Sequence, residues 1–477
     1  MNADERSWFL KGKPHAVQMR ALELSNRRKG FLHFEEQGLG KTAIVLAEYA
    51  DFVNEGLIDG MVVVCPNSLK INWFKEADKW GAKYKTRIVL PEDIKSLDLN
   101  KMKPPFIITI NYESIRKGTR GLEALNAIMK GRRSMVAADE SINIKNPHSN
   151  QTFEALQLSK GAAFTRSMSG APISQGPHDL WAQGRFVGLY NGIRATQFKL
   201  RYCRMGGFQG RQVVGVKEDL VEELWRTVDE NGFRALKEEW TDLPEKIYAL
   251  PRMITMTKEQ RRMYLEMKEE FITYLDETDE GSFVEAQMTM TKLMKLHQIS
   301  SGIIIDNEGL EHFIIPTEEN PKMQEVLRAL QETRGKVLIF THFRLSTKAV
   351  FEYLGKRGYE PVLLEGGMKV QEVENRKEIF NDDSKCRVAV LQAQSHMYGH
   401  TLLGGKGEDR CSTSFYYEVD YNLNTRVQTE DRNHRYGQDK AVVYVDFIAS
   451  EIEEIAVTAL QRKKNVAKLI LDTFKGR

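Results

Sequence analysis

Short runs of apolar residues alternate with mixed polar and apolar stretches along the first part of the chain. The runs are "FLHF" (31–34), "MVVVCP" (61–66), "FIITI" (106–110), "SMVAAD" (134–139) and "AFTRSMSG" (163–170). Ten or more residues with a helix-like pattern follow each run. Continuous apolar runs of this length are typical of parallel strands that are buried on both faces of a sheet. Residues 1–215 are therefore predicted to form one α/β lobe.

The pattern then changes twice. From about 217 to 300 the sequence is charged and helix-like, with no strand-like run, and residues 216–320 are predicted to be a helical inter-lobe region. Strand-like runs then return at "KVLIFT" (336–341), "PVLLE" (361–365), "RVAVLQ" (387–392), "SFYYEV" (414–419) and "AVVYVDFI" (441–448). Residues 321–477 are therefore predicted to form a second α/β lobe that closes with a basic helix near 451–474.

Composition adds little to this picture. A chain of 477 residues exceeds what one core usually organises, and 41% hydrophobic with 28% charged residues is typical of a soluble globular protein. The net charge of +3 neither requires nor excludes a polyanionic partner. The four cysteines lie far apart, without zinc-ligand or redox spacing, and no stretch resembles a signal peptide or a membrane span. We expect an intracellular protein with reduced thiols, no structural zinc and no membrane contact.

The first candidate for chemistry is "EEQGLGKTAIVLAEY", which follows the first predicted strand. Gly38 and Gly40 let the backbone curl so that its N–H groups can converge on phosphate oxygens. Lys41 would reach the β and γ phosphates, and Thr42 would ligate Mg²⁺. The strict pattern of a phosphate-binding loop, G-x-x-x-x-G-K-[ST], has a glycine where this chain has Glu35, so the match is incomplete. Its place at a strand-to-helix junction favours a phosphate-binding loop.

A carboxylate pair ends another predicted strand, in "SMVAADESINIKN". A phosphate-binding loop needs a carboxylate on a neighbouring strand to hold magnesium, and a second one to orient the attacking water. Asp139 is predicted to be the metal-side carboxylate and Glu140 the base. The alternative is that the pair merely caps a helix.

Two arginines lie three residues apart in "QTEDRNHRYGQ" (428–438), a stretch whose polarity argues against a core position. If the stretch is helical, Arg432 and Arg435 share one face. One interpretation is a solvated helix face on which they pair with Glu430 and Asp431. The other is that they bind an anion.

The order of several segments resembles the Swi/Snf-like branch of superfamily two helicases. The most specific are "DESINIKN" (139–146), "RSMSGAPISQGPHDLW" (166–181) and "QTEDRNHRYGQ" (428–438). Five others are similar to further motifs: "LKGKPHAVQMRAL" (10–22), "VVVCPNSLKINWFKEADKW" (62–80), "NYES" (111–114), "DLPEKIYALPRMITMTKEQRRMY" (242–264) and "KVLIFTHF" (336–343). The resemblance covers most of the chain and implies two RecA-like parallel-sheet lobes with a helical insert and a C-terminal helix.

The resemblance also implies roles for individual residues. Arg432 and Arg435 would come from the second lobe to complete the ATP site, where Lys41, Asp139 and Glu140 act. Ser169, Gly170 and Ala171 would couple the ATP state to the nucleic-acid track. The expected ATP contacts are Gln18 (to adenine), Gly38, Leu39, Gly40, Lys41, Thr42 and Gln428, with Mg²⁺ on Thr42 and Asp139.

Two segments depart from the family pattern. Ser141 and Ile142 stand where many relatives have Ala and His, so a histidine link to the coupling motif is absent or replaced. The segment 392–422 aligns around a glycine but is several residues longer than usual. Ser395 is its candidate DNA contact, whereas His396 and His400 are expected to be ordinary loop histidines.

Duplex DNA would be held mainly through phosphates, which carry no sequence information. The candidate contacts are Asn67, Ser68, Asn111, Tyr112, Arg116, Lys117 and Ser395. The basic clusters around 116–120 and 130–133 are each more easily explained as solvated surface. Trp73 and Trp80 have the seven-residue spacing of a buried helix face, so core packing is expected for them instead of base stacking.

These observations lead to one expectation and two alternatives. We expect a DNA-dependent ATPase, a monomeric motor that translocates on double-stranded or branched DNA and remodels it in replication, recombination or repair. Branch migration, fork regression and reannealing are the remodelling reactions considered, and "TQFKLRYC" leans towards fork-remodelling relatives. The alternatives are a strand-separating 3′-to-5′ DNA or RNA helicase and an ATP-gated binding module with weak hydrolysis. A compact bacterial or phage protein in the cytoplasm is expected, or a nuclear one if the host is eukaryotic.

Overall fold

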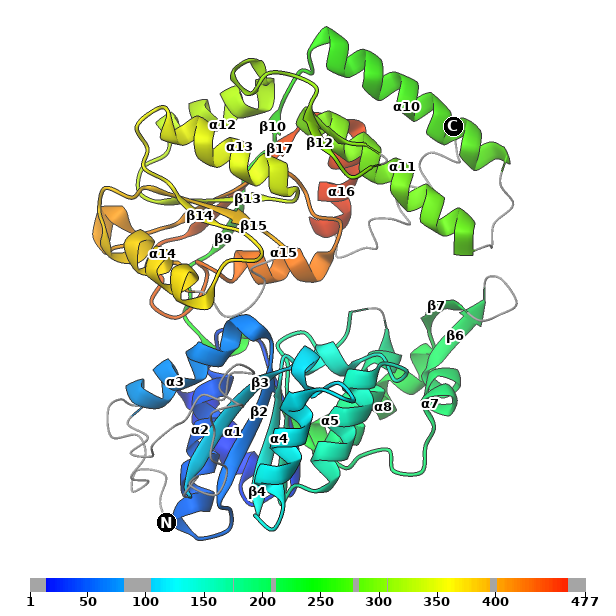
Figure 1. The fold of residues 1–477 in the computed structure, drawn as a ribbon, viewed down its shortest axis with the longest axis vertical. Helices are drawn as coiled ribbons and strands as arrows, with labels where there is room; N and C mark the ends of the chain where they lie inside the picture. Colours follow the sequence, from blue (N-terminus) through cyan, green and yellow to red (C-terminus); the bar gives the residue numbers. More distant parts are fainter. Residues whose placement is uncertain are drawn as a thin grey trace. The chain divides into compact units, whose positions relative to one another are not determined.

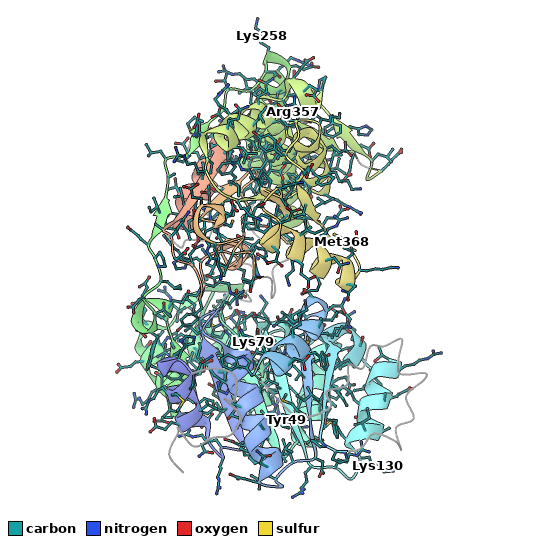
Figure 2. All side chains as sticks on the ribbon, turned by 90° about the vertical axis from the view of Figure 1, so that its left-hand side faces the viewer. Tyr49, Lys79, Lys130, Lys258, Arg357 and Met368 are labelled. Carbon is teal, nitrogen blue, oxygen red and sulfur yellow. The ribbon has the colours of Figure 1, made fainter. Side chains whose placement is uncertain are left out.

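The computed structural model describes residues 14–80, 104–174, 176–206, 212–277, 283–306, 308–394 and 401–461. The chain divides into two compact units, Met1–Asp242 and Leu243–Arg477. Both units are drawn in Figure 1. Buried side chains such as Tyr49 fill the interior of unit 1, whereas Lys130 is exposed (Figure 2).

Unit 1 is built on a six-stranded sheet in the order β3-β2-β4-β5-β1-β8, in which all the paired strands are parallel. The strands are β1 (Gly30–Glu35), β2 (Gly60–Cys65), β3 (Phe106–Asn111), β4 (Ser134–Asp139), β5 (Phe164–Met168) and β8 (Gly232–Ala235). The helices are α1 (Ala16–Ser25), α2 (Lys41–Asn54), α3 (Lys70–Lys79), α4 (Arg120–Met129), α5 (Asn150–Lys160), α6 (Leu180–Phe186), α7 (Ala195–Tyr202), α8 (Glu218–Glu230) and α9 (Lys237–Trp240).

Strands β2 and β4 are buried at every position, which explains why they read as continuous apolar runs. Because the strands are parallel, their carboxyl ends meet at one edge of the sheet. The phosphate-binding loop, the Asp139 strand end and the segment starting at Ser169 all begin at this edge. The topology therefore gathers residues that are far apart in the sequence.

Unit 2 is built on a seven-stranded parallel sheet in the order β10-β17-β16-β13-β15-β14, with β9 also paired to β17. The strands are β9 (Lys246–Tyr248), β10 (Arg252–Met253), β13 (Val337–Thr341), β14 (Val362–Leu364), β15 (Val388–Gln392), β16 (Thr413–Tyr416) and β17 (Val442–Ile448). Its helices are α10 (Lys258–Glu277), α11 (Phe283–Ser301), α12 (Pro321–Glu332), α13 (Arg344–Gly355), α14 (Val370–Asp382), α15 (Leu423–Glu430) and α16 (Glu451–Gln461).

The prediction that residues 217–300 contain no strand is wrong. This segment contains β8, β9 and β10, and β8 pairs with β1 whereas β9 and β10 pair with β17. These strands have only two to four residues and no continuous apolar run, so pairing with a neighbour, not local pattern, makes them extended. Two antiparallel pairs were also not predicted, β6 (Cys203–Gly206) with β7 (Gln212–Val216) and β11 (Ile303–Ile305) with β12 (Glu311–Phe313).

The predicted helical insert is present as α10 and α11, which share an apolar cluster with α16 through residues such as Phe271, Leu296 and Ile452. The inter-lobe segment 216–320 is thus divided between the two units, and the three-part domain division stays a prediction. The predicted closing helix is described as far as Gln461, and its remainder lies outside the described residues.

The predicted fold class is confirmed, because each unit is a parallel sheet with helices. All four cysteines are buried and free, and burial raises the pKa of the Cys411 thiol to about 12. Among the described residues, every helix is too short or too polar to cross a membrane.

Candidate nucleotide-binding site

The loop between β1 and α2 has the backbone that phosphate binding needs. Gly38 and Gly40 have φ angles of 87° and 86°, and Gly40 is the N-cap residue of α2 and has no capping side chain. The first N–H groups of a helix have no partner within the helix and favour anions. A Cβ at Gly40 would lie 2.2 Å from Nε2 of Gln18. The left-handed φ of Gly40 favours glycine there, and the predicted adenine-contact residue packs directly on the loop.

Lys41 is buried at the first position of α2. Its Nζ donates hydrogen bonds to the carbonyl oxygens of Glu35 at 2.6 Å and Glu36 at 3.3 Å. The neighbouring Thr42 is partly exposed on the same first turn. The ammonium group thus lies inside the loop, where a phosphate oxygen could replace its carbonyl partners.

The carboxylate pair follows β4, as predicted from the sequence. Oδ2 of Asp139 accepts a hydrogen bond from Nε1 of Trp73 at 2.9 Å, and Oδ1 accepts one from the backbone N–H of Glu140 at 3.0 Å. Burial raises the pKa of Asp139, while the bond from Trp73 and the charge of Lys41 act in the opposite direction. The structure therefore holds a buried carboxylate in a fixed orientation.

Glu140 adopts a strained backbone conformation. Its φ of 51° and ψ of 54° lie in the left-handed region, which costs a residue with a Cβ roughly 1–2 kcal/mol. Its Oε1 accepts a hydrogen bond from Nε2 of Gln37 at 3.3 Å. Strain of this kind persists where the surrounding structure enforces it and is common at catalytic positions. The helix-cap alternative does not explain it, because Glu140 makes no side-chain cap bond to the 3₁₀ turn that follows.

Trp73 is buried, as predicted, but it does more than fill the core. Its indole N–H bonds the predicted metal-side carboxylate. A buried tryptophan usually finds a partner for this group, and that was the available signal in the sequence. Trp80 is partly buried, and its N–H bonds Glu76 of its own helix at 2.9 Å.

The predicted coupling segment packs against the loop. The backbone N–H of Ser169 donates to the carbonyl of His33 at 3.0 Å. A Cβ at Gly170 would lie 2.6 Å from Cγ of Gln37, and the N–H of Ala171 bonds Oγ of Ser169 at 3.3 Å. Gln37 therefore contacts both the coupling segment and Glu140.

A second connection runs through Ser141, which departs from the family pattern. Its hydroxyl donates to Oε1 of Gln183 at 2.8 Å. Nε2 of Gln183 in turn donates to the carbonyls of Pro172 at 2.7 Å and Asp179 at 2.9 Å. Ser141 and Gln183 are completely buried. A serine and a glutamine thus link the carboxylate segment to the residues that follow Ala171, without a histidine.

A buried charge network under the loop explains Glu35, where the strict motif has glycine. His33 bonds Oε1 of Glu35 at 2.9 Å and Oε2 of Glu48 at 3.4 Å, and the guanidinium of Arg166 donates three hydrogen bonds to the carboxylate of Glu48. Burial alone would lower the pKa of His33, but the two glutamates raise it from 6.5 to about 9. Burial alone would raise the pKa of Glu48, but Arg166 and His33 lower it to about 2. His33 is therefore protonated and Glu48 ionised at neutral pH.

The arginine segment of unit 2 differs from the sequence prediction in two ways. Helix α15 ends at Glu430, so Arg432 and Arg435 lie in the turns that follow and do not share a helix face. Residues 428–434 are also buried, with Arg432 only 2% exposed, whereas Arg435 is partly exposed. Some of the buried polar groups have hydrogen-bond partners inside unit 2. Nδ2 of Asn433 donates to Oγ of Ser414 at 3.2 Å, and Nε2 of Gln438 donates to the carbonyl of Cys411 at 2.9 Å.

The solvated-face interpretation does not fit this segment. The carboxylate of Glu430 is buried and accepts hydrogen bonds from Arg426, Lys246 and Tyr248. Gln428 is also buried, and its Oε1 accepts no hydrogen bond among the described residues. A buried polar atom of this kind is compatible with a bound partner such as a nucleotide.

The predicted DNA contacts divide into two groups. Asn67, Arg116 and Lys117 are exposed, and Ser68 and Asn111 are partly exposed, after the ends of β2 and β3. Tyr112 is only 2% exposed, and its hydroxyl donates to the carbonyl of Asp139 at 2.8 Å. Its side chain supports the carboxylate strand and is not at the surface. The prediction that the side chain of Tyr112 contacts DNA is therefore wrong. Ser395, His396 and His400 lie outside the described residues.

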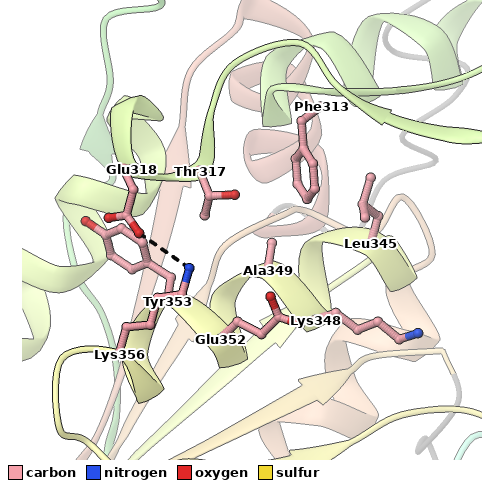
Figure 3. A pocket seen from close by; sticks show the side chains of 9 residues that line it. All are labelled: Phe313, Thr317, Glu318, Leu345, Lys348, Ala349, Glu352, Tyr353 and Lys356. Atoms are coloured by element: carbon pink, nitrogen blue, oxygen red, sulfur yellow. Dashed lines mark ion pairs between the residues drawn. The ribbon is translucent and has the colours of Figure 1, made fainter.

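A pocket of about 160 Å³ lies in unit 2 beside α13 (Figure 3). Its lining includes Phe313, Tyr353 and an ion pair in which Nζ of Lys356 is 3.9 Å from Oε1 of Glu318. Ligand pockets usually exceed roughly 300 Å³. Because it is small and contains none of the predicted site residues, this pocket is not the nucleotide site.

Sequence comparison relates the chain to chromatin-remodelling and recombination proteins. It is 23% identical over 501 residues to the chromatin structure-remodeling complex subunit snf21 of Schizosaccharomyces pombe, covering 99% of this chain and 40% of that protein. It is 25% identical to a SWI/SNF-related matrix-associated actin-dependent regulator of chromatin subfamily A-like protein 1 homolog of Caenorhabditis elegans, covering 95% of this chain and 61% of that protein. It is also 25% identical to the DNA repair and recombination protein RAD54-like of Drosophila ananassae, covering 93% and 60%. The chain thus spans less than two thirds of each relative.

The structural comparison includes the Sulfolobus solfataricus SWI2/SNF2 ATPase core in complex with dsDNA, with 22% identity, a TM-score of 0.45, and coverage of 100% of this chain and 96% of that chain. The model of the SNF2-related domain matches residues 15–302. That match covers more than half of the chain, including the phosphate-binding loop and the carboxylate pair. The chain therefore belongs to the SNF2-related domain family.

Proposed function

We propose that the protein is a DNA-dependent ATPase that translocates on double-stranded or branched DNA and remodels its structure. The observation that carries the proposal is the gathering of Lys41, Asp139 and Glu140 at one sheet edge of unit 1. These residues supply the phosphate cation, the metal carboxylate and the base that phosphoryl transfer needs. Family membership supports the same reaction class.

ATP would bind with its phosphates against the N–H groups of the loop and the Nζ of Lys41, and with its adenine near Gln18. Thr42 and Asp139 would hold Mg²⁺, which would neutralise charge on the transferred phosphoryl group. Glu140, held by Gln37, would orient the attacking water. Arg432 and Arg435 of unit 2 would add positive charge in the transition state, which makes hydrolysis conditional on the conformation of the motor.

Two connections would carry the nucleotide state to the coupling segment. One runs from Glu140 through Gln37 to Gly170. The other runs from Ser141 through Gln183 to Pro172. Both connect the carboxylate segment to residues 169–172. A movement of one segment would therefore displace the other through side chains that are in contact.

DNA is proposed as the track because relatives are named as chromatin-remodelling and DNA repair proteins. Asn67, Ser68, Asn111, Arg116 and Lys117 offer polar and cationic groups for phosphate contacts. Remodelling in replication, recombination or repair is the biological setting that we propose. The motor would act as a monomer.

The test measures ATP hydrolysis with duplex DNA, a fork, a four-way junction, single-stranded DNA and RNA. Strong stimulation by duplex or branched DNA, together with displacement of a third strand from a triplex, is expected. Stimulation only by single strands or RNA would favour the strand-separating helicase. The ATP-gated binding module would be favoured if no nucleic acid raised the rate of ATP hydrolysis and the protein bound DNA when ATP was present.

A further inference from the structure

The first residues of unit 2 form a short strap along the segment that carries the two arginines. Strand β9 pairs in parallel with β17, and the N–H of Val442 donates to the carbonyl of Glu245 at 2.9 Å. The strap, residues 244–248, begins two residues after Asp242, where unit 1 ends. It is thus the part of unit 2 nearest in sequence to unit 1.

Three hydrogen bonds join the strap to the arginine segment. Nζ of Lys246 donates to Oε2 of Glu430 at 3.1 Å, and the hydroxyl of Tyr248 donates to the same oxygen at 2.9 Å. Nε2 of His434 donates to the carbonyl of Pro244 at 2.7 Å. In the sequence, Glu430 and His434 lie two residues on either side of Arg432, and His434 directly precedes Arg435.

The carboxylate that receives these bonds is firmly held. Glu430 is 4% exposed, and its other oxygen accepts from Nε of Arg426 at 2.9 Å. Its backbone carbonyl accepts from the hydroxyl of Tyr444, whose ring stacks on that of Tyr248 at 5.4 Å. Hydrogen bonds to a charged, buried group are among the stronger ones in proteins.

The charges agree with this geometry. Burial alone would lower the pKa of Lys246, but Glu430 and Asp431 outweigh that effect and raise it. Burial together with Glu430 raises the pKa of Tyr248 to about 12. Both donors therefore keep their protons across the physiological range.

We propose that Lys246 and Tyr248 are positioning residues that fix Glu430, and so set the placement of Arg432 and Arg435 for ATP hydrolysis. A displacement of the connection between the units would then reach the arginines directly through the strap. The inference rests on the proposed function for its catalytic consequence, but the mechanical contact can be tested without it.

The test compares Tyr248→Phe, Lys246→Met and the double variant with Arg252→Met in the full chain. Arg252 lies in β10, four residues beyond Tyr248, and pairs with Glu325 at 3.1 Å and with Glu332, away from the arginine segment. It therefore controls for the loss of an ion pair in the same connection. Lys246→Arg serves as the conservative variant that keeps a cation near Glu430.

Two readouts are expected to change together. Backbone amide exchange of residues 431–438 should become about tenfold faster in the double variant, because about 1.4 kcal/mol of local stabilisation is lost. The kcat for DNA-stimulated hydrolysis should fall about tenfold, with KM for ATP and the Kd for duplex DNA within about twofold of wild type. Arg252→Met should leave both unchanged, and Lys246→Arg should retain most of the wild-type kcat.

Unchanged amide exchange in the double variant would overturn the proposal, whatever the activity. An equal loss of kcat in Arg252→Met would also overturn it, because the effect would then be general to the sheet. If wild-type protein hydrolyses no ATP with any DNA, the proposed function fails instead, and the amide exchange result still decides whether the strap holds the segment.

Discussion

The indole N–H of Trp73 donates a hydrogen bond to Oδ2 of Asp139 across 2.9 Å, from inside the core of unit 1. The hydroxyl of Tyr112 bonds the backbone carbonyl of the same aspartate at 2.8 Å. Two aromatic side chains from separate elements thus fix both the side chain and the backbone of the proposed metal-side residue. The orientation of a metal carboxylate commonly depends on such partners.

Trp73→Phe should weaken the use of Mg²⁺, because it keeps the buried ring but removes the donor to Asp139. We expect the Mg²⁺ concentration for half-maximal hydrolysis to rise about tenfold, since partners of metal ligands typically contribute that much or more. A magnesium titration of ATP hydrolysis measures this. Trp80→Phe is the control, since its N–H bonds Glu76 on its own helix; an equal shift in that variant would contradict the assignment.

Ser141→Ala should impair the connection between the carboxylate and coupling segments. It leaves Oε1 of Gln183 buried without its donor, which costs roughly 1–3 kcal/mol of unfolding free energy. The ratio of DNA-stimulated to basal hydrolysis should also fall. Ser159→Ala removes a comparable hydroxyl bond, to Leu156 in α5, and should lower stability without changing the ratio. A ratio that stays at the wild-type value in Ser141→Ala would refute the connection.

The network under the loop makes stability depend on pH. The raised pKa of His33 means that its contribution is fully present below about 6.5 and is lost as pH rises through about 9. The lowered pKa of Glu48 means that its contribution is present above about 4.5 and is lost as pH falls towards 2. We therefore expect unfolding free energy to decrease between pH 6.5 and 9 by a few kcal/mol at most.

His33→Gln tests this directly, because glutamine bonds without titrating. Denaturant unfolding at several pH values should show a flatter profile between 6.5 and 9 than the wild type. A slope that is identical in both proteins would mean that another group causes the dependence.

Lys41→Ala and Glu140→Gln should each reduce DNA-stimulated hydrolysis to background. A positioned base contributes roughly 10²–10⁴-fold, and the lysine contacts the phosphates on which charge develops. Glu140→Gln should still bind ATP, whereas Lys41→Ala should bind it weakly. Phosphate release and nucleotide binding are measured on both variants. Wild-type turnover in either would remove the loop from the proposed site.

The sequence was informative where local pattern and chemistry coincide. Continuous apolar runs predicted β2 and β4, and the glycines before Lys41 predicted a loop whose backbone can curl, which their left-handed φ angles match. It was uninformative where tertiary pairing creates the structure. Strands β8 and β9 have no apolar run, and only a neighbouring strand makes them extended.

Burial of polar residues was the main error. The stretch around Arg432 was judged too polar for a core, yet Arg432 is buried, and Asn433 and Gln438 donate hydrogen bonds inside unit 2. Tyr112 was taken for a surface contact because it follows a strand end, but its hydroxyl faces Asp139. In both cases the partner is distant in sequence, so no local signal reveals it.

The central claim is that arginines of the second unit complete an ATP site built on the first. The most direct test measures ATP hydrolysis at saturating duplex DNA, and duplex affinity, for Arg435→Ala and the wild type. The account predicts that hydrolysis falls about 10³-fold or more while the Kd for DNA stays within about twofold. A collapse of DNA affinity, with hydrolysis restored once enough DNA is added, would contradict it and assign Arg435 to the DNA track.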